Sequence, residues 1–138
     1  MIILDTNVIS ELMHVAPHAN VLEWMDRQSE ASIWITSITV FEVTLGIEIL
    51  AQGRKQSDLR NSFQALRQEL GERIAPFDES AAERAAELMA SCQRVGRPRD
   101  LRDTMIAGIV LTHGAILATR NVSHFTDISA KVVNPWTS

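Results

Sequence analysis

Three carboxylates far apart in the sequence, Asp5, Glu42 and Asp103, are the side chains with the clearest chemical potential. Carboxylates that cluster repel one another, so they do not all ionise without a positive partner. An all-oxygen cluster suits Mg²⁺ or Mn²⁺ better than zinc. Such ions lower the pKa of a bound water, neutralise a phosphate and stabilise a leaving oxygen. If the three carboxylates meet, the chemistry that they favour is phosphodiester hydrolysis.

Glu42 is the most informative of the three because its surroundings are apolar. Residues 38–51 are predicted to form a helix that is hydrophobic almost all round, which indicates burial on more than one side. A buried carboxylate without a partner is costly, so Glu42 needs either a cation or a raised pKa. The alternative is a buried pair with an arginine.

Asp5 and Asp103 each have a simpler explanation as residues that cap a helix. Asp5 directly follows an apolar run, at a predicted helix start. If Asp100 is the N-cap of the helix predicted at 101–113, Asp103 occupies its third position, where the helix dipole alone favours a carboxylate. The argument for a site therefore depends on the combination of these residues with Glu42.

Segments with strand character alternate along the chain with segments of helical periodicity. The predicted strands cover residues 2–4, 32–35, 73–77, 115–119 and 132–133. Predicted helices begin after Asp5 and then cover 20–28, 38–51, 56–70, 79–95 and 101–113, with Gly53, Gly71 and Gly114 closing three of them. This alternation predicts an α/β fold with a parallel sheet, in a single domain spanning residues 1–138.

The predicted elements bring polar residues to one edge of that sheet. Sites in open parallel sheets form beyond the carboxyl ends of the strands. Asp5 lies just past the first strand, Asn121 follows the fourth, and Asp103 is in the first turn of the helix before that strand. We therefore expect these three residues to lie close together.

The charge of the chain gives a mixed indication about nucleic acid. A net charge of −4 and a pI near 5.5 count against a nucleic-acid binder, which usually has a basic footprint. The charge is uneven, however. Residues 94–103 carry four arginines against two aspartates, and residues 54–67 carry three arginines and one lysine against one aspartate. Either segment is a phosphate contact or simply a solvated face.

Several other classes of protein and site are disfavoured. The single cysteine, Cys92, cannot form an internal disulfide; it is predicted to be a small buried side chain on a helix, which fits a reducing, cytoplasmic setting. Asp5 interrupts the apolar start, so no signal peptide is expected, and no apolar run approaches the roughly 18 residues that span a membrane. His14 and His18 have the spacing of a zinc pair, but Pro17 breaks the helix that would align them.

Four short motifs, taken together and in order, resemble those of the PIN-domain family, and specifically its VapC-type toxins, including the FitB-like branch. The motifs are Met1-Ile-Ile-Leu-Asp-Thr-Asn-Val-Ile-Ser-Glu11, Ile38-Thr-Val-Phe-Glu-Val43, Asp103-Thr-Met-Ile-Ala107 and Ala118-Thr-Arg-Asn-Val122, and the closing Asn134-Pro135-Trp136 also fits. Each motif alone is weak, but the set is highly specific. The resemblance implies a PIN-like three-layer α/β/α sandwich with a central parallel sheet of about four to five strands.

Position by position, the resemblance makes Asp5, Glu42 and Asp103 the metal-binding and catalytic carboxylates, with Mg²⁺ or Mn²⁺ as the cofactor. Asn121 falls where many relatives carry a fourth acidic residue and others carry Asn. In many of those with Asn, an Asp follows three residues later, and this chain has His124 there. The fourth catalytic position is therefore open between Asn121 and His124.

Two further polar residues match positions near the family's site. Asn7 and Thr119 would orient the metal-binding side chains. Their alternative role is local hydrogen bonding within turns.

The resemblance also implies an activity and partners. It implies a metal-dependent endoribonuclease, the toxin of a type II toxin–antitoxin module, acting as a homodimer and in a larger assembly with a small VapB- or FitA-like antitoxin that binds DNA. One alternative is a catalytically weak PIN-fold binding module that acts with the antitoxin in operator repression. Another is a structure-specific DNA nuclease, which the absence of long insertions in the sequence disfavours.

Overall fold

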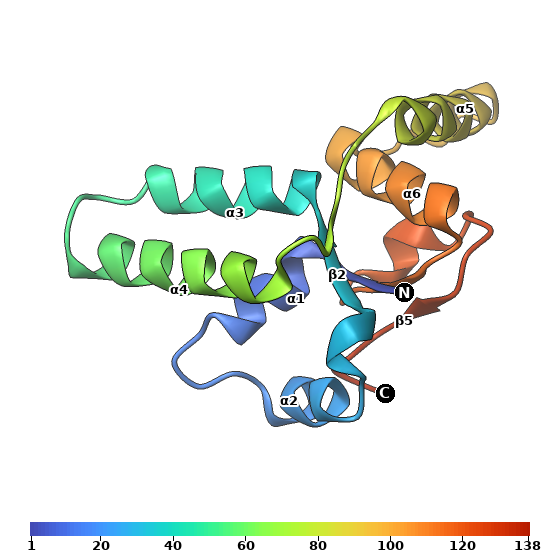
Figure 1. Cartoon of the computed structure of the whole chain (residues 1–138). Helices are drawn as coiled ribbons and strands as arrows, with labels where there is room; N and C mark the ends of the chain where they lie inside the picture. The colour runs from blue at the N-terminus through green and yellow to red at the C-terminus, as the bar shows by residue number, and fades with distance from the viewer.

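A computed structural model describes residues 1–138, and its centre is a parallel sheet of five short strands (Figure 1). The order of the strands across the sheet is β3-β2-β1-β4-β5, and each neighbouring pair is parallel. The predicted parallel sheet is therefore confirmed. The strands are β1 (Ile2–Leu4), β2 (Ile33–Thr36), β3 (Ile74–Ala75), β4 (Ile116–Ala118) and β5 (Val132–Val133).

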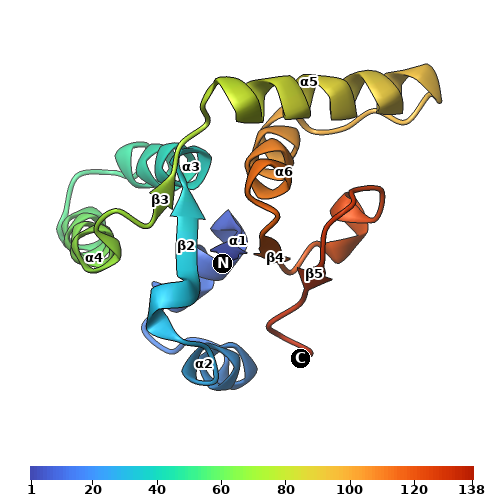
Figure 2. The ribbon, with the colours of Figure 1, turned by 45° about the vertical axis from the view of Figure 1, so that its right-hand side comes forward.

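Helices cover both faces of the sheet, which confirms the expected three layers (Figures 1 and 2). One apolar core lies between the sheet and the first four helices, and a second lies between the sheet and the last two. The helices are α1 (Thr6–Leu12), α2 (Ala19–Asp26), α3 (Ser37–Glu48), α4 (Arg54–Leu70), α5 (Glu79–Arg94) and α6 (Leu101–His113), with short 3₁₀ turns η1 (Glu30–Ser32) and η2 (Val122–Phe125).

The central strand β1 contributes to both cores because its side chains alternate between the two faces. Ile2 and Leu4 belong to the core under α1 to α4, whereas Ile3 belongs to the core under α5 and α6. All three are buried. This explains why the strand is apolar throughout, as expected for a parallel strand that is covered on both faces.

Two predicted boundaries are wrong, and each has a local cause. The strand predicted at 73–77 is reduced to Ile74–Ala75, because Pro76 has no N–H to continue the ladder and the Phe77 N–H is donated to the Ser37 hydroxyl at 3.0 Å instead. Gly53 does not close the preceding helix, which ends at Glu48; it is the N-cap of α4. Gly71 and Gly114 do follow helix ends as predicted.

The outer surface of α3 corrects the expectation that this helix is buried on more than one side. Val43 and Ile47 face the core, but Phe41, Leu45 and Ile49 are 56%, 42% and 76% exposed. The apolar pattern of α3 therefore leaves a hydrophobic strip on the surface of the single chain. Exposed apolar strips of this kind are typical of protein contacts.

The remaining sequence expectations concern Cys92 and the membrane. Cys92 is buried on α5, as predicted, with its thiol 3.2 Å from Asp127 Oδ2, and burial raises its pKa. None of the helices combines the length and the apolar character needed to cross a membrane.

Candidate active site

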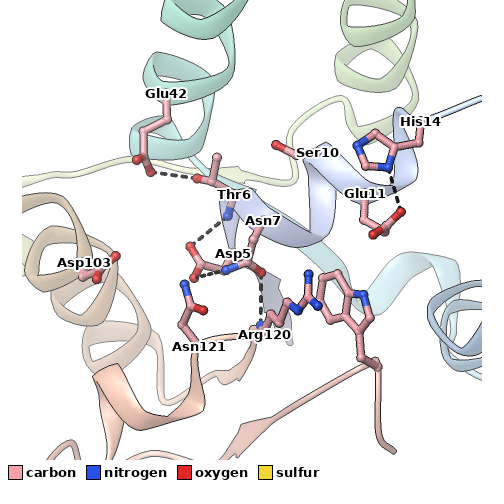
Figure 3. Close-up of a pocket in the computed structure, with 11 residues that line it drawn as sticks. Asp5, Thr6, Asn7, Ser10, Glu11, His14, Glu42, Asp103, Arg120 and Asn121 are labelled. Atoms are coloured by element: carbon pink, nitrogen blue, oxygen red, sulfur yellow. Dashed lines mark hydrogen bonds and ion pairs between the residues drawn. The ribbon is translucent and has the colours of Figure 1, made fainter. Parts of the chain in front are cut away.

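The expected carboxylates meet at a cavity of about 420 Å³ beyond the carboxyl ends of β1 and β4 (Figure 3). Asp5 follows β1, Glu42 lies on α3, Asp103 is in the first turn of α6, and Asn121 follows β4. The strand order puts β1 beside β4, so segments more than a hundred residues apart supply the same wall. The lining residues are almost all polar: Asp5, Thr6, Asn7, Ser10, Glu11, His14, Glu42, Asp103, Arg120, Asn121 and Trp136.

Asp5 is both the N-cap of α1 and the most buried carboxylate of the cavity. Its Oδ1 accepts the Thr6 N–H at 2.8 Å, and the residue is only 4% exposed. Burial is the main cause that raises the pKa of Asp5 to about 6; the hydrogen bonds from Thr119 and Thr6 lower it, and the charges of Asp103 and Glu42 raise it further. The Asp5 side chain therefore both caps α1 and lines the cavity.

Thr119 and Asn7, the two supporting residues suggested by sequence, both contact Asp5. Thr119 donates its hydroxyl to Asp5 Oδ2 at 2.8 Å, and Asn7 donates its Nδ2 to the same oxygen at 3.3 Å. Asn7 also donates to the Thr119 hydroxyl at 3.2 Å. These bonds hold the Asp5 carboxylate in one orientation, so the contacts are more than local turn bonding.

Glu42 is bound on one side by a hydroxyl and approached on the other by a cation. Its Oε1 accepts the Thr6 hydroxyl at 2.7 Å, and its Oε2 lies 3.7 Å from Arg102 Nη1. The side chain is 23% exposed, so it is not the fully buried, unpaired carboxylate that the sequence indicated. The alternative prediction, a buried pair with an arginine, is therefore partly right. Arg102 does approach Glu42, but it is 47% exposed and the distance between the two charged groups is long.

Asp103 occupies the third position of α6, where the Asp100 side chain accepts its backbone N–H at 3.0 Å. Burial and the charge of Asp100 raise the pKa of Asp103, whereas His124 lowers it. The His124 Nδ1 lies 3.3 Å from Asp103 Oδ2. Like Asp5, Asp103 combines a helix-end position with a place on the cavity wall.

Asn121 and His124, the two candidates for the fourth position, lie on different sides of Asp103. Asn121 lines the cavity and is directed toward Asp5 and Asp103 (Figure 3). His124 instead lines a neighbouring polar cavity of about 340 Å³ together with Arg97. The geometry therefore favours Asn121 as the fourth polar group of the main cavity.

The donor set of the cavity fits a hard divalent cation. Asp5, Glu42, Asp103 and Asn121 offer oxygen ligands, and the charges of Asp103 and Glu42 add to the effect of burial in raising the pKa of Asp5. No three carboxylate, histidine or cysteine side chains lie close enough together to hold an ion directly. Mg²⁺ does not require that, because it usually keeps several waters and takes only one or two carboxylates.

Six lining residues were not identified from the sequence as parts of the site, and three of them, Thr6, Arg120 and Trp136, bear on its geometry. Thr6 joins Asp5 to Glu42 through its backbone N–H and its hydroxyl. Arg120 lies at the end of the cavity away from Asp103 (Figure 3), and its guanidinium lies over the ring of Trp136, which also lines the cavity. All three lie inside the sequence motifs that resemble the PIN-domain family, and this position was the signal that could have identified them.

Known proteins resemble this chain over almost its whole length. The model of the PIN domain family matches residues 2–131. The chain is 35% identical to VapC ribonuclease Y4jK of Sinorhizobium fredii and 34% identical to toxin FitB of Neisseria gonorrhoeae; each match covers 99% of this chain, and 98% and 99% of the relative. A solved structure of FitAB bound to an IR36 DNA fragment superposes with a TM-score of 0.91 at 34% identity, covering 99% of this chain and 96% of the other.

The resemblance seen in the four motifs is therefore confirmed by matches that run along almost the whole chain. A cavity of carboxylates at the edge of a five-stranded parallel sheet accompanies those matches. This chain belongs to the PIN-domain family.

Proposed function

We propose that this protein is a divalent-metal-dependent endoribonuclease and the toxin of a type II toxin–antitoxin pair. The observation that carries the proposal is the convergence of Asp5, Glu42, Asp103 and Asn121 on one polar cavity. Support comes from two relatives, one named as a VapC ribonuclease and one as a toxin, which are 35% and 34% identical to this chain over nearly its full length.

In this proposal one or two of Asp5, Asp103 and Glu42 would bind the cation directly and the others, with Asn121, would bind it through its waters. When bound, Mg²⁺ or Mn²⁺ neutralises the phosphate and makes water a better nucleophile. Asp5 is suited to bind the cation because two hydrogen bonds to Oδ2 and one to Oδ1 fix the orientation of its carboxylate. Thr6 fixes Glu42 in the same way. The protein thus supplies a preformed set of carboxylates, and the cation that they bind would position the RNA phosphate.

The direct test is incubation of a single-stranded RNA with the purified protein in Mg²⁺, in Mn²⁺ and in EDTA. We expect cleavage only with metal, and a loss of about 100-fold or more in Asp5→Asn and Asp103→Asn, in line with the removal of a major electrostatic group. Glu83→Gln, an exposed change on α5, is the matched control. Undiminished cleavage in EDTA would rule the proposal out.

The proposed partners are a second copy of the chain and a small DNA-binding antitoxin. The exposed strip on α3 (Phe41, Leu45 and Ile49) is a surface that either partner would bury. The structure of FitAB with DNA supports an antitoxin partner, because that neighbour is similar over the whole chain. Co-expression with a short reading frame, if one lies beside the gene, followed by co-purification, tests this part.

A second function remains because no three ligating side chains are close together in this conformation. In that case the chain is a weakly catalytic binding module that serves the antitoxin in operator repression. This function predicts that RNA survives prolonged incubation with metal while the complex with the antitoxin still binds operator DNA. The cleavage and operator-binding assays together separate the two functions.

A further inference from the structure

Arg120 is the one arginine that lines the catalytic cavity, and its charge is not used by the carboxylates there. It forms no ion pair. The cavity carboxylates are engaged elsewhere: Asp5 by hydroxyl and amide groups, Glu42 by Thr6, and Asp103 by His124. Arg120 is an exposed residue, so its guanidinium is open to a ligand that enters the cavity.

An aromatic ring explains how Arg120 stays apart from the acids. Its guanidinium carbon lies 5.2 Å from the centre of the Trp136 ring, and its backbone N–H is donated to Asn7 Oδ1 at 3.1 Å. Stacking on an indole face favours a guanidinium and leaves its edge donors available. Arg120 is therefore held at both its backbone and its head group.

Trp136 is itself fixed. It is only 8% exposed, its backbone N–H is donated to Asn134 Oδ1 at 2.9 Å, and its carbonyl accepts from Asn20 Nδ2 at 2.8 Å. The ring thus provides a rigid support at the end of the chain. This gives a physical role to the closing Asn134-Pro135-Trp136 motif, which the carboxylate chemistry does not use.

The cavity has two ends with different character (Figure 3). Asp5, Asp103 and Asn121 gather at one end, whereas the head group of Arg120 lies over the Trp136 ring at the other end, on the side of Glu11. Glu11 does not neutralise Arg120, because it is bound to His14 Nδ1 at 2.8 Å and to the His18 N–H at 3.3 Å. A phosphate chain lying along the cavity would meet the carboxylate end with one phosphate and Arg120 with the next.

We infer that Arg120, supported by Trp136, is a binding site for the RNA phosphate that neighbours the scissile one. The inference rests on the proposed ribonuclease function. Arg120 contributes to holding the strand, and Trp136 is a positioning residue that acts through Arg120. The fork of guanidinium donors matches phosphate oxygens, which a lysine at this position would contact only as a point charge.

The first test measures binding without cleavage. A short labelled single-stranded RNA is titrated in Mg²⁺ with Asp103→Asn protein and with the same protein also carrying Arg120→Ala, at several salt concentrations. We expect a dissociation constant about tenfold or more higher in the double variant. The slope of log affinity against log salt should fall by about 0.7, the value for one phosphate contact on a single strand. Arg120→Lys should lie between the two.

Arg67→Ala is the matched control, because Arg67 also lies over an aromatic ring, Phe63 at 5.7 Å, but outside the catalytic cavity. It should leave RNA affinity unchanged. Equal affinity for RNA with and without Arg120 would overturn the inference.

The second test separates this inference from the proposed function. Bis(4-nitrophenyl) phosphate has a single phosphate, so Arg120→Ala in the otherwise unchanged protein should raise the KM for RNA by a much larger factor than it changes the hydrolysis of this small substrate. A parallel loss on both substrates would place Arg120 on the reacting phosphate and overturn the assignment. Failure of the unchanged protein to cleave RNA would count against the proposed function, while the binding comparison would still decide the role of Arg120.

Discussion

The buried hydroxyl of Thr119 donates a hydrogen bond to Asp5 Oδ2 at 2.8 Å, joining the ends of β4 and β1 across 114 residues of sequence. The same hydroxyl oxygen accepts the Asn121 N–H at 3.0 Å. One side chain therefore orients the central carboxylate and the backbone of the fourth polar residue. This contact exists only because β1 and β4 are neighbours in the sheet.

Thr119→Val should destabilise the protein by about 1–3 kcal/mol, because the buried Asp5 carboxylate loses a hydrogen-bond donor and the Asn121 N–H loses its acceptor. The valine methyl replaces the hydroxyl with little change in volume, so the effect reports hydrogen bonding rather than packing. Urea unfolding followed by circular dichroism measures it. Thr119→Ser keeps the hydroxyl and should recover most of the stability, and an equal loss in both variants would contradict this reasoning.

Asp5→Asn should raise stability at high pH while abolishing activity. The pKa of Asp5 is about 6 in the folded protein against an ordinary 3.8, so between these values the folded state binds more protons than the unfolded chain. Stability is therefore lost as the pH rises from about 4 through 6, by at most about 3 kcal/mol.

The measurement is urea unfolding of Asp5→Asn and the unchanged protein from pH 4 to pH 8 in EDTA. The variant should gain its advantage across this range and keep it above pH 6. Glu83→Gln, an exposed carboxylate change, serves as the control. A difference between Asp5→Asn and the unchanged protein that is the same at every pH would show that Asp5 does not titrate in this window.

Mg²⁺ or Mn²⁺ should raise the melting temperature, because an ion that binds only the folded state stabilises it. At an ion concentration ten times the dissociation constant the gain is about 1.4 kcal/mol. The gain should be small in Asp103→Asn, which lacks one charge of the cluster. A thermal-shift titration at pH 8 checks this without any RNA, and identical shifts in both proteins would argue against a metal held by Asp103.

Gly108→Ala should destabilise the packing of α5 on α6 by about 1–3 kcal/mol. A methyl group at this position would meet the Ala81 carbonyl oxygen at 2.5 Å and the Ala85 Cβ at 2.9 Å. Gly46→Ala on α3 is a useful contrast, since nothing lies within 4 Å of the added methyl. That change should stabilise by about 0.5–1 kcal/mol through helix propensity. Thermal melts of both variants would show opposite signs.

Local patterns were enough to predict most of the secondary structure. Alternation of apolar runs with helical periodicity placed all five strands and most helices, and residues 101–113 and 132–133 were predicted with the observed limits. These signals depend on the side chains of one segment, so the sequence carries them directly. The 3₁₀ turns were missed, and β3 was predicted too long, because these features depend on which distant groups accept or supply hydrogen bonds, as Ser37 does for Phe77.

The site was predicted unequally. Asp5, Glu42 and Asp103 could be proposed from residue type, position and motif, and Asn7 and Thr119 from motif alone. The burial of Glu42 was overestimated, because periodicity shows that a helix is apolar but not which of its faces meets the core. Phe41, Leu45 and Ile49 are equally apolar in sequence, yet they remain on the surface.

The sequence by itself determined the chemical groups, the elements that carry them and the family to which they belong. Only the tertiary structure decided that Asn121 lines the main cavity while His124 contacts Asp103 from a neighbouring one, and that Arg120 lies over the Trp136 ring. The physical reason is that these relations are set by strand order and by contacts between residues far apart in the chain. Spacing along the sequence gives no measure of such distances.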